Sequence, residues 1–321
     1  MLDLLVLRDR LRGVYAKHGN FIDAAVRFFT ALLAMALLNS GIGYMKQLLN
    51  PVIPIALALI CSVCPWGGIC WILALFMLAH IFAASVELAL TTAAFLLIVA
   101  LLYYGFTPGD SWIMILTPLL FALKIPYLIP ILVGFLGSMV SVVPMSCGIV
   151  IYYILEYARG NARPIAEGSA SGITQQFVQM LTGIFGNRTM LLYIIAFAIT
   201  LIAVRQIRSM SVDNSWHIAI IAGILLLLLS MFLGIMMFRI SLKAGSLAAG
   251  CAVSFAAGEI LRFFLFHVDY SRTEYTQFED DDYYYYVKAV PKISVSAPEP
   301  RVQKLNRARK RRSREDSDTK R

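Results

Sequence analysis

Between residues 27 and 267 the sequence is almost continuously apolar, and this feature decides the class of fold. Of the 321 residues, 59% are hydrophobic and 15% are charged. A helix needs about 20 apolar residues to cross roughly 30 Å of hydrocarbon, and lipid offers no partner to a free backbone amide. The sequence therefore predicts an all-α, polytopic transmembrane helix bundle, with about eight spans in residues 21–267.

Charges, prolines and turn residues divide the apolar stretch into separate expected helices. Residues 69–104 contain neither Gly nor Pro. As one helix they would extend about 54 Å, so we expect two spans that meet near residues 85–87. The other expected helices are a short one over 52–64 and conventional spans over 28–45, 189–206, 216–238 and 245–267.

The segment from residue 105 to residue 160 combines apolar sequence with five of the twelve prolines. Proline removes a backbone donor and clashes with the preceding helical turn, so neighbouring protein or water must satisfy the freed groups. We expect Pro/Gly-broken helices in 112–158, over 112–124, 126–140 and 142–158. A polar interfacial segment, with an amphipathic helix, is expected over 161–187.

Residues 1–20 are expected to form an amphipathic helix at the membrane interface. Basic residues alternate with apolar ones at helical spacing, which differs from the basic-then-apolar order of a signal peptide. A frayed soluble leader is the alternative. The apolar positions are Leu4, Leu7, Leu11 and Val14, and the basic positions are Arg8, Arg10, Arg12 and Lys17.

The five cysteines all lie in apolar segments. Cys61, Cys64 and Cys70 resemble part of a metal site in their spacing, but zinc requires a fourth ligand that the sequence does not place nearby. We therefore interpret the cysteines as small buried residues. The chain contains no HExxH, GxSxG or P-loop motif, so we predict neither an enzyme nor a cofactor.

Basic residues predict the orientation of the chain. Residues 301–321 contain ten basic and three acidic side chains, and further basic residues lie near the N-terminus. Both termini are therefore predicted to be cytoplasmic, which requires an even number of crossings. Arg239 and Lys243 then lie outside, against the usual bias.

Residues 268–321 form a polar tail, acidic and tyrosine-rich at first and then basic. A largely disordered, solvated tail is one interpretation. In the functional interpretation the basic run binds anionic lipid, while Tyr283, Tyr284, Tyr285 and Tyr286 dock on a cytosolic partner by adding a strand or burying aromatic rings. Nucleic-acid binding is not expected, because no aromatic residues interleave with the basic run.

Several segments of the chain resemble a family of multi-pass membrane proteins from clostridial bacteria. The likeness is carried by residues 268–275 and 278–292 of the tail, and by Leu116-Thr-Pro-Leu-Leu and Lys124-Ile-Pro126 in the body. It implies a bacterial plasma membrane as the location. The resemblance brings no assigned activity, and so no site residue.

Ionisable residues inside lipid are costly and are therefore candidates for function. His80 and Glu87, seven positions apart, would share a helical face and could relay protons. In the alternative, His80 is hydrogen-bonded inside the protein and Glu87 marks a loop. Glu259 and Arg262, three positions apart, are expected to pair locally.

Lys124 lies among the expected broken helices, beside Pro126. Interrupted helices in carriers expose backbone dipoles that bind substrate or ions, so we predict a substrate path with Lys124, Thr117, Ser138 and Ser141. Lys124 could equally extend its ammonium to the membrane surface.

Small residues recur every fourth position near the end of the apolar stretch, at Ser246, Gly250, Ser254 and Gly258. Such stripes let helices approach closely in lipid. Packing within the chain is the first interpretation, and a homodimer seam is the second.

Two functional hypotheses follow from these features. The first is a permease-like transport component, with the broken helices along its substrate path. The second is a membrane scaffold that recruits a cytosolic partner through the tail. A variant joins them, in which a separate ATPase powers the permease, since the chain carries no nucleotide-binding motif.

Overall fold

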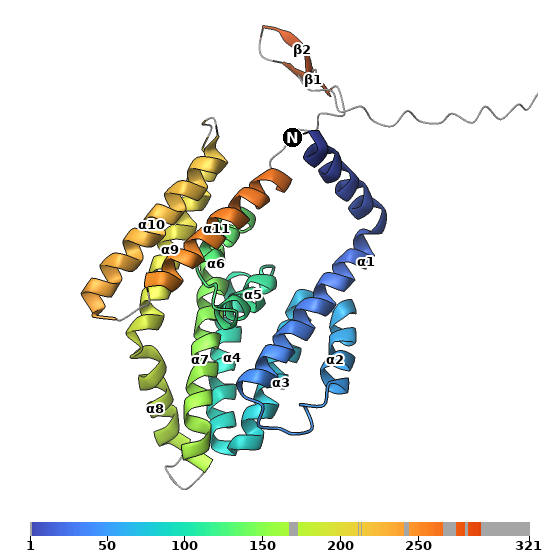
Figure 1. The fold of residues 1–321 in the computed structure, drawn as a ribbon. Coiled ribbons are helices and arrows are strands. Elements are labelled where there is room, and N and C mark those ends of the chain that lie inside the picture. Colours follow the sequence, from blue (N-terminus) through green and yellow to red (C-terminus); the bar gives the residue numbers. More distant parts are fainter. Residues whose placement is uncertain are drawn as a thin grey trace, which may run out of the picture. The chain divides into compact units, whose positions relative to one another are not determined.

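The structure is a computed structural model, and it describes residues 2–166, 173–210, 212, 214–240, 244–265, 274–279 and 282–289. The chain divides into two units. One comprises residues 13–266, here called the helical body, and the other comprises residues 1–12 and 267–321. Within the described residues there are eleven α-helices and one β-hairpin (Figure 1), which confirms the helical fold class.

Most element bounds follow the expected segmentation. The exceptions are the N-terminal helix, which is continuous to Gly41, and the helix expected over 142–158, which continues to Ala166 and into the segment expected to be interfacial. The helices are α1 (Leu2–Gly41), α2 (Val52–Val63), α3 (Trp66–Ala84), α4 (Val86–Phe106), α5 (Ser111–Ala122), α6 (Leu128–Leu136), α7 (Val142–Ala166), α8 (Ile173–Phe185), α9 (Arg188–Arg208), α10 (Ser215–Phe238) and α11 (Ala244–Leu265). A 3-10 turn, η1 (Met139–Ser141), precedes α7, and the strands are β1 (Glu274–Glu279) and β2 (Tyr284–Ala289).

Seven helices within the described residues are long and apolar enough to cross a membrane. They lie in α1, α3, α4, α7, α9, α10 and α11. The chain is therefore a multi-pass membrane protein. The estimate of eight crossings stays a prediction, because α2 and α5 are apolar but have only 12 residues each.

The division of residues 69–104 into two helices is confirmed. The first, α3, ends at Ala84, and α4 begins at Val86. Between them Ser85 is extended, with φ −158° and ψ 126°, and its hydroxyl accepts a hydrogen bond from the amide of Leu88. A serine in this conformation is a favourable helix N-cap, which explains the break in an otherwise apolar run.

The first helix joins the expected N-terminal helix and the first expected span. A kink at His18, with φ −127°, interrupts α1. Farther along, Arg27 donates to the carbonyl of Cys64 (3.3 Å), and Asn39 meets His80 (2.8 Å). These pairs show that α1 and α3 run in the same direction, so the short α2 returns the chain between them.

The proline-rich segment forms a hairpin of two short helices, α5 and α6. The first runs alongside α7 in the same direction, because the residue numbers of their contacts rise together. These contacts are Asp110–Ser141, Thr117–Gly148 and Phe121–Tyr152. With 12 and 9 residues, the two helices extend about 18 and 14 Å, less than the hydrocarbon thickness.

Both ends of this hairpin lie beside the start of α7. Ser141 donates to the carboxylate of Asp110 (2.5 Å) and accepts from the amide of Ser138 (2.9 Å). Asp110 precedes α5, whereas Ser138 and Ser141 follow α6. The chain therefore enters and leaves the hairpin at one place, and residues 123–127 form its tip.

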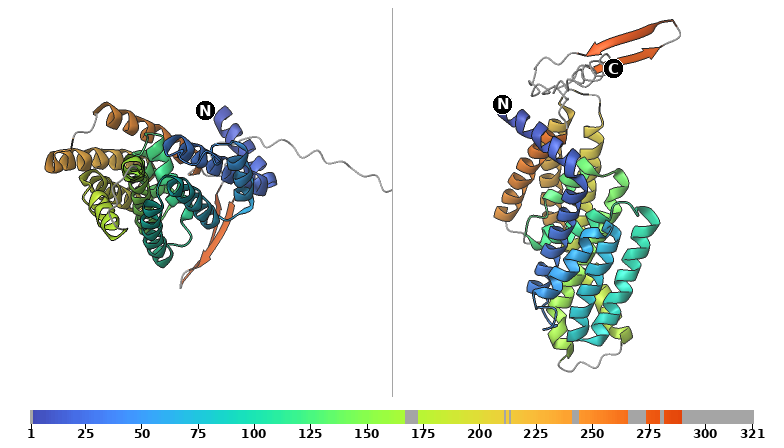
Figure 2. Two further views of the ribbon diagram at one scale, coloured as in Figure 1. Left: turned by 90° about the horizontal axis from the view of Figure 1, so that it is seen from below. Right: turned by 90° about the vertical axis from the view of Figure 1, so that its right-hand side faces the viewer.

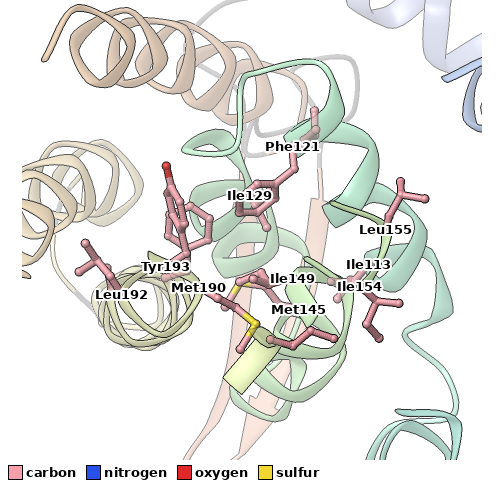
Figure 3. Close-up of a cluster of buried hydrophobic side chains, with 14 of the residues drawn as sticks. Ile113, Phe121, Ile129, Met145, Ile149, Ile154, Leu155, Met190, Leu192 and Tyr193 are labelled. Atoms are coloured by element: carbon pink, nitrogen blue, oxygen red, sulfur yellow. The ribbon is translucent and has the colours of Figure 1, made fainter. Parts of the chain in front are cut away.

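The core of the helical body surrounds this hairpin. Phe121, Ile129 and Tyr193 come together from α5, α6 and α9, next to Met145 and Ile149 of α7 (Figure 3). The hydroxyls of Tyr127 and Tyr193 lie 3.3 Å apart. Aromatic packing thus fixes one side of the hairpin tip against α9.

The last three helices of the body stand together at one side of it (Figures 1 and 2). Gly134 of α6 fits against Val204 of α9, and Gly223 of α10 faces the same valine. A methyl group at either glycine would collide with this side chain. Glycine is therefore needed at both positions for the close approach of these helices.

The described part of the tail is a two-stranded antiparallel hairpin. Its register pairs Glu274 with Ala289 and Glu279 with Tyr284. An extended element after Phe278 was predicted and is confirmed by β2, whereas β1 was not predicted. Residues 290–321, including the basic run, lie outside the described residues.

Candidate functional site

A cavity of about 480 Å³ lies in the helical body. This volume is within the range of small-molecule sites, roughly 300–1,000 Å³. Its walls come from α1, α3, α4, α5 and α7, and most of the lining is apolar. The apolar lining includes Leu37, Leu38, Leu73, Ala74, Met77, Leu96, Val99, Ile115, Pro118, Leu119, Ile151 and Leu155.

One end of the cavity is lined by neutral aromatic residues. Trp71 of α3 donates from Nε1 to the hydroxyl of Tyr104 on α4 (2.8 Å), and their rings stack. The neighbouring Tyr103 donates to the carbonyl of Pro108 (2.6 Å) and lies 2.5 Å from the hydroxyl of Ser111. The indole N–H of Trp71 and the hydroxyl of Tyr103 are therefore hydrogen-bonded within the protein.

The other end of the cavity carries its two cations, Lys124 and Arg159. Arg159 donates from Nε to the carbonyl of Gly41 (3.0 Å) and from Nη1 to Glu156 (3.3 Å). A Cβ atom at Gly41 would collide with the guanidinium, so glycine lets α7 hold this group against the end of α1. Glu156 is not part of the lining, which contains no carboxylate among the described residues.

Lys124 occupies an unusual backbone position at the end of α5. Its φ is 63°, in the left-handed region. Its amide donates to the carbonyl of Phe121, and the amide of Ile125 donates to that of Leu120, both over 3.0 Å. These two bonds form a Schellman motif, in which the left-handed residue is usually glycine. The following Pro126 prevents the helix from continuing.

The Lys124 ammonium has no acceptor in the part of the chain that the structure describes. Its side chain is exposed, and it forms neither a hydrogen bond nor an ion pair with any described residue. Arg159, in contrast, has two of its donors occupied. The cationic end of the cavity therefore presents an ammonium that has no partner among the described residues, and an anionic ligand would form a charge-assisted hydrogen bond with it.

The structure brings only one of the four predicted path residues to the cavity. Lys124 lines it. Thr117 donates to the carbonyl of Ile113 (2.8 Å) and fits against Gly148 at the α5–α7 contact. Ser138 and Ser141 lie at the base of the α5–α6 hairpin with Asp110. These three residues therefore support the hairpin and do not line the cavity.

His80 and Glu87 do not share a helix, because α3 ends at Ala84. His80 is fully buried, and its Nε2 lies 2.8 Å from Oδ1 of Asn39. Its Nδ1 accepts from the amide of Met45 (3.3 Å). Both ring nitrogens are thus occupied within the protein, as in the alternative interpretation of this residue.

The small-residue stripe packs within the chain at two of its members. Gly250 approaches the ring of Tyr127 at the hairpin tip so closely that a Cβ atom would collide with it, and Gly258 faces Ile220 of α10. Ser254 is fully buried. Ser246 begins the stripe near the start of α11. The stripe therefore lets α11 cover α6 and α10.

The expected pair of Glu259 and Arg262 is confirmed at 2.8 Å. Glu259 also meets Nδ1 of His217 on α10 at 2.5 Å, a partner that the sequence analysis did not identify. In the other unit, Tyr283, Tyr284, Tyr285 and Tyr286 are exposed at the turn and on β2. Four adjacent exposed tyrosines are consistent with docking but identify no partner.

Sequence reasoning missed Arg159 and the Trp71–Tyr104 pair. Arg159 lay one residue beyond the expected helix 142–158 and was therefore not considered as an intramembrane charge. Arg159 and Gly41 are more than 100 positions apart, so the local sequence around either residue does not indicate their contact. Trp71 and Tyr104 are 33 positions apart in the sequence, and only the antiparallel packing of α3 and α4 brings them together.

Comparison with known proteins identifies no relative for this chain. No family model, no curated protein and no solved structure matches it.

Proposed function

We propose that this protein is a transport component of the bacterial plasma membrane, and that the cavity beside α5 is part of its substrate path. The observation that carries this proposal is the α5–α6 hairpin, which places Lys124, without a partner among the described residues, at the edge of a cavity. Hairpins of short helices within membrane sequence are tolerated where they line such spaces. Transporters use interrupted helices to build their sites in this way.

Other parts of the proposal follow from the sequence. Both termini are placed in the cytoplasm, where the basic tail would bind anionic lipid. An ATPase supplied by another chain would provide energy, and the protein itself would catalyse no reaction.

Scaffolding is the second candidate, favoured by the β1–β2 hairpin. Two-stranded hairpins are marginal alone, and the unpaired edge of each strand can accept a further strand. Tyr284 and Tyr286 lie on one face of the hairpin and are 69% and 76% exposed. Such aromatic residues are common anchors in protein interfaces.

Cysteine labelling tests transport without knowledge of the substrate. In full-length protein with its five native cysteines replaced by alanine, Ala74→Cys places a thiol in the cavity. We expect a membrane-impermeant maleimide to label it from both sides of sealed vesicles, because a transporter exposes its path alternately. Ala58→Cys, a matched change at a fully buried position of α2, should remain unlabelled.

Labelling of Ala74→Cys from one side only would contradict a through-path. Removal of residues 268–321 separates the two candidates. Two-sided labelling that persists without the tail supports a self-contained path. Loss of a captured cytosolic partner, with labelling from one side only, supports the scaffold.

A further inference from the structure

The lining of the cavity is graded from one end to the other. Trp71, Tyr103 and Tyr104 line one end, and aliphatic side chains form most of the middle. The cations lie at the other end, where the rings of Phe121 and Tyr152 also line the cavity. On α5 the lining extends from Met114 to Lys124, about 15 Å along the helix axis. A ligand that fills this space must be apolar over most of its length and anionic at one end.

The aromatic end carries no charged side chain and therefore does not favour an ionic ligand group. The indole N–H of Trp71 and the hydroxyl of Tyr103 already have partners within the protein. The hydroxyl of Tyr104 accepts from Trp71 and is a neutral donor without an acceptor among the described residues. A small hydrophilic anion would leave the aliphatic middle facing water or empty space, which is unfavourable. The apolar part of an amphiphile would cover that surface.

The cationic end is built to present charge. A lysine in the left-handed region is disfavoured relative to glycine, and the α5 turn holds Lys124 there through backbone bonds alone. Residues in sparsely populated conformations are concentrated at functional sites. Arg159, held by Gly41 and Glu156, adds a planar fork of donors of the type that binds phosphate oxygens.

We infer that this cavity binds a membrane phospholipid with an anionic headgroup. Its phosphate lies at Lys124 and Arg159, and an acyl chain extends along α5 toward Trp71. The lipid enters from the surrounding bilayer, because the five helices that form the walls are membrane helices or lie between them. The inference rests on the proposed function only in taking the same cavity as the site.

Lipid binding to the purified full-length protein tests this inference. Native mass spectrometry would follow titration with phosphatidylglycerol, and with phosphatidylcholine as the zwitterionic comparison. We expect phosphatidylglycerol to bind more tightly than phosphatidylcholine. Lys124→Gly should weaken phosphatidylglycerol binding by about tenfold or more, the effect of losing one charge-assisted bond. Lys124→Arg should retain it.

Arg239→Gly is the matched control. Arg239 is the other left-handed cation at a helix end among the described residues, with φ 54° at the end of α10, and it is not part of the lining. The control makes the same change of charge and backbone away from the cavity, so phosphatidylglycerol binding should be unchanged. Equal binding by the Lys124→Gly and Arg239→Gly variants would overturn the assignment.

Inorganic phosphate distinguishes a lipid from a free anion. It should not displace the lipid at concentrations that leave the protein intact, since it lacks the apolar contacts. Full displacement would overturn the assignment of a lipid. Equal binding of the two lipids would overturn the assignment of an anionic headgroup. If either of these results were accompanied by two-sided labelling of Ala74→Cys, the lipid inference would be rejected and the transport proposal retained. One-sided labelling with selective lipid binding would retain the site and reject transport.

Discussion

The last turns of α5 and α10 share a backbone conformation but differ in their surroundings. Each is followed by a left-handed cation, Lys124 or Arg239. At α5 the amide of Ile125, the residue after Lys124, donates to the carbonyl of Leu120 (3.0 Å). At α10 the amide of Ile240, the residue after Arg239, donates to the carbonyl of Ile235 (3.2 Å). Only Lys124 lines the cavity.

The length of helix before the turn explains this difference. The 24 residues of α10 extend about 36 Å, enough to bring its cation beyond the hydrocarbon. The 12 residues of α5 extend about 18 Å, so Lys124 stops beside the middle of α7. The same turn therefore gives a surface cation after a long helix and a candidate site after a short one.

The position of α5 depends on its close contact with α7, and Gly148→Ala should disrupt it. The added Cβ would come within 2.6 Å of Cβ of Thr117, a backbone-attached atom that cannot rotate away. We expect a loss of about 2 kcal/mol in the free energy of unfolding, typical of overpacking. Reversible unfolding in mixed micelles would measure it.

Gly160→Ala is the control on the same helix, because an added methyl group there would meet no atom of a neighbouring helix within 4 Å. Alanine should raise the free energy of unfolding by about 0.5–1 kcal/mol through its better helix propensity. If both variants behaved alike, the contact between Thr117 and Gly148 would not fix α5.

A second, smaller effect is expected at the base of the hairpin. Asp110→Asn removes the charge that accepts a hydrogen bond from the fully buried Ser141. We expect a loss of about 1.5 kcal/mol, the lower value for a bond to a charged group. A double-mutant cycle with Ser141→Ala would measure the coupling, and additive effects would show that the two residues do not act together.

Much of this fold could be predicted from apolar runs and their interruptions. Ser85 divides α3 from α4 near the expected residues, and the three broken helices begin within two residues of the expected positions 112, 126 and 142. The expected end of α7 was wrong, because the helix continues to Ala166. Prolines and the length limit of a span carry that information locally. The hairpin formed by α5 and α6 was not predicted, because its direction depends on the contact between Asp110 and Ser141.

The candidate site was predictable only at Lys124, whose charge is conspicuous in apolar sequence. Arg159 joins it through α7, and Gly41 through α1. Neither contact has a signal in the local sequence. The expected contributions of Thr117, Ser138 and Ser141 to a substrate path assumed that neighbours in sequence face one cavity, whereas the hairpin turns these side chains to its base and to α7.

The smallest effect concerns the two left-handed cations themselves. Lys124→Gly and Arg239→Gly should each raise the free energy of unfolding by about 0.5–1 kcal/mol, since glycine relieves the left-handed strain but has more freedom in the unfolded chain. Unfolding in neutral micelles would measure both. A loss of stability in Lys124→Gly alone would mean that the lysine side chain supports the fold.

Adding phosphatidylglycerol to the micelles should then distinguish the end of α5 from the end of α10 by the stability that each variant gains. A ligand that binds only the folded state adds stability in proportion to its saturation, so the unaltered protein and Arg239→Gly should both gain. Lys124→Gly should gain less, because the cation facing the cavity is lost. Equal gains in all three proteins would mean that the lipid binds elsewhere, and that the ends of α5 and α10 differ in position without differing in function.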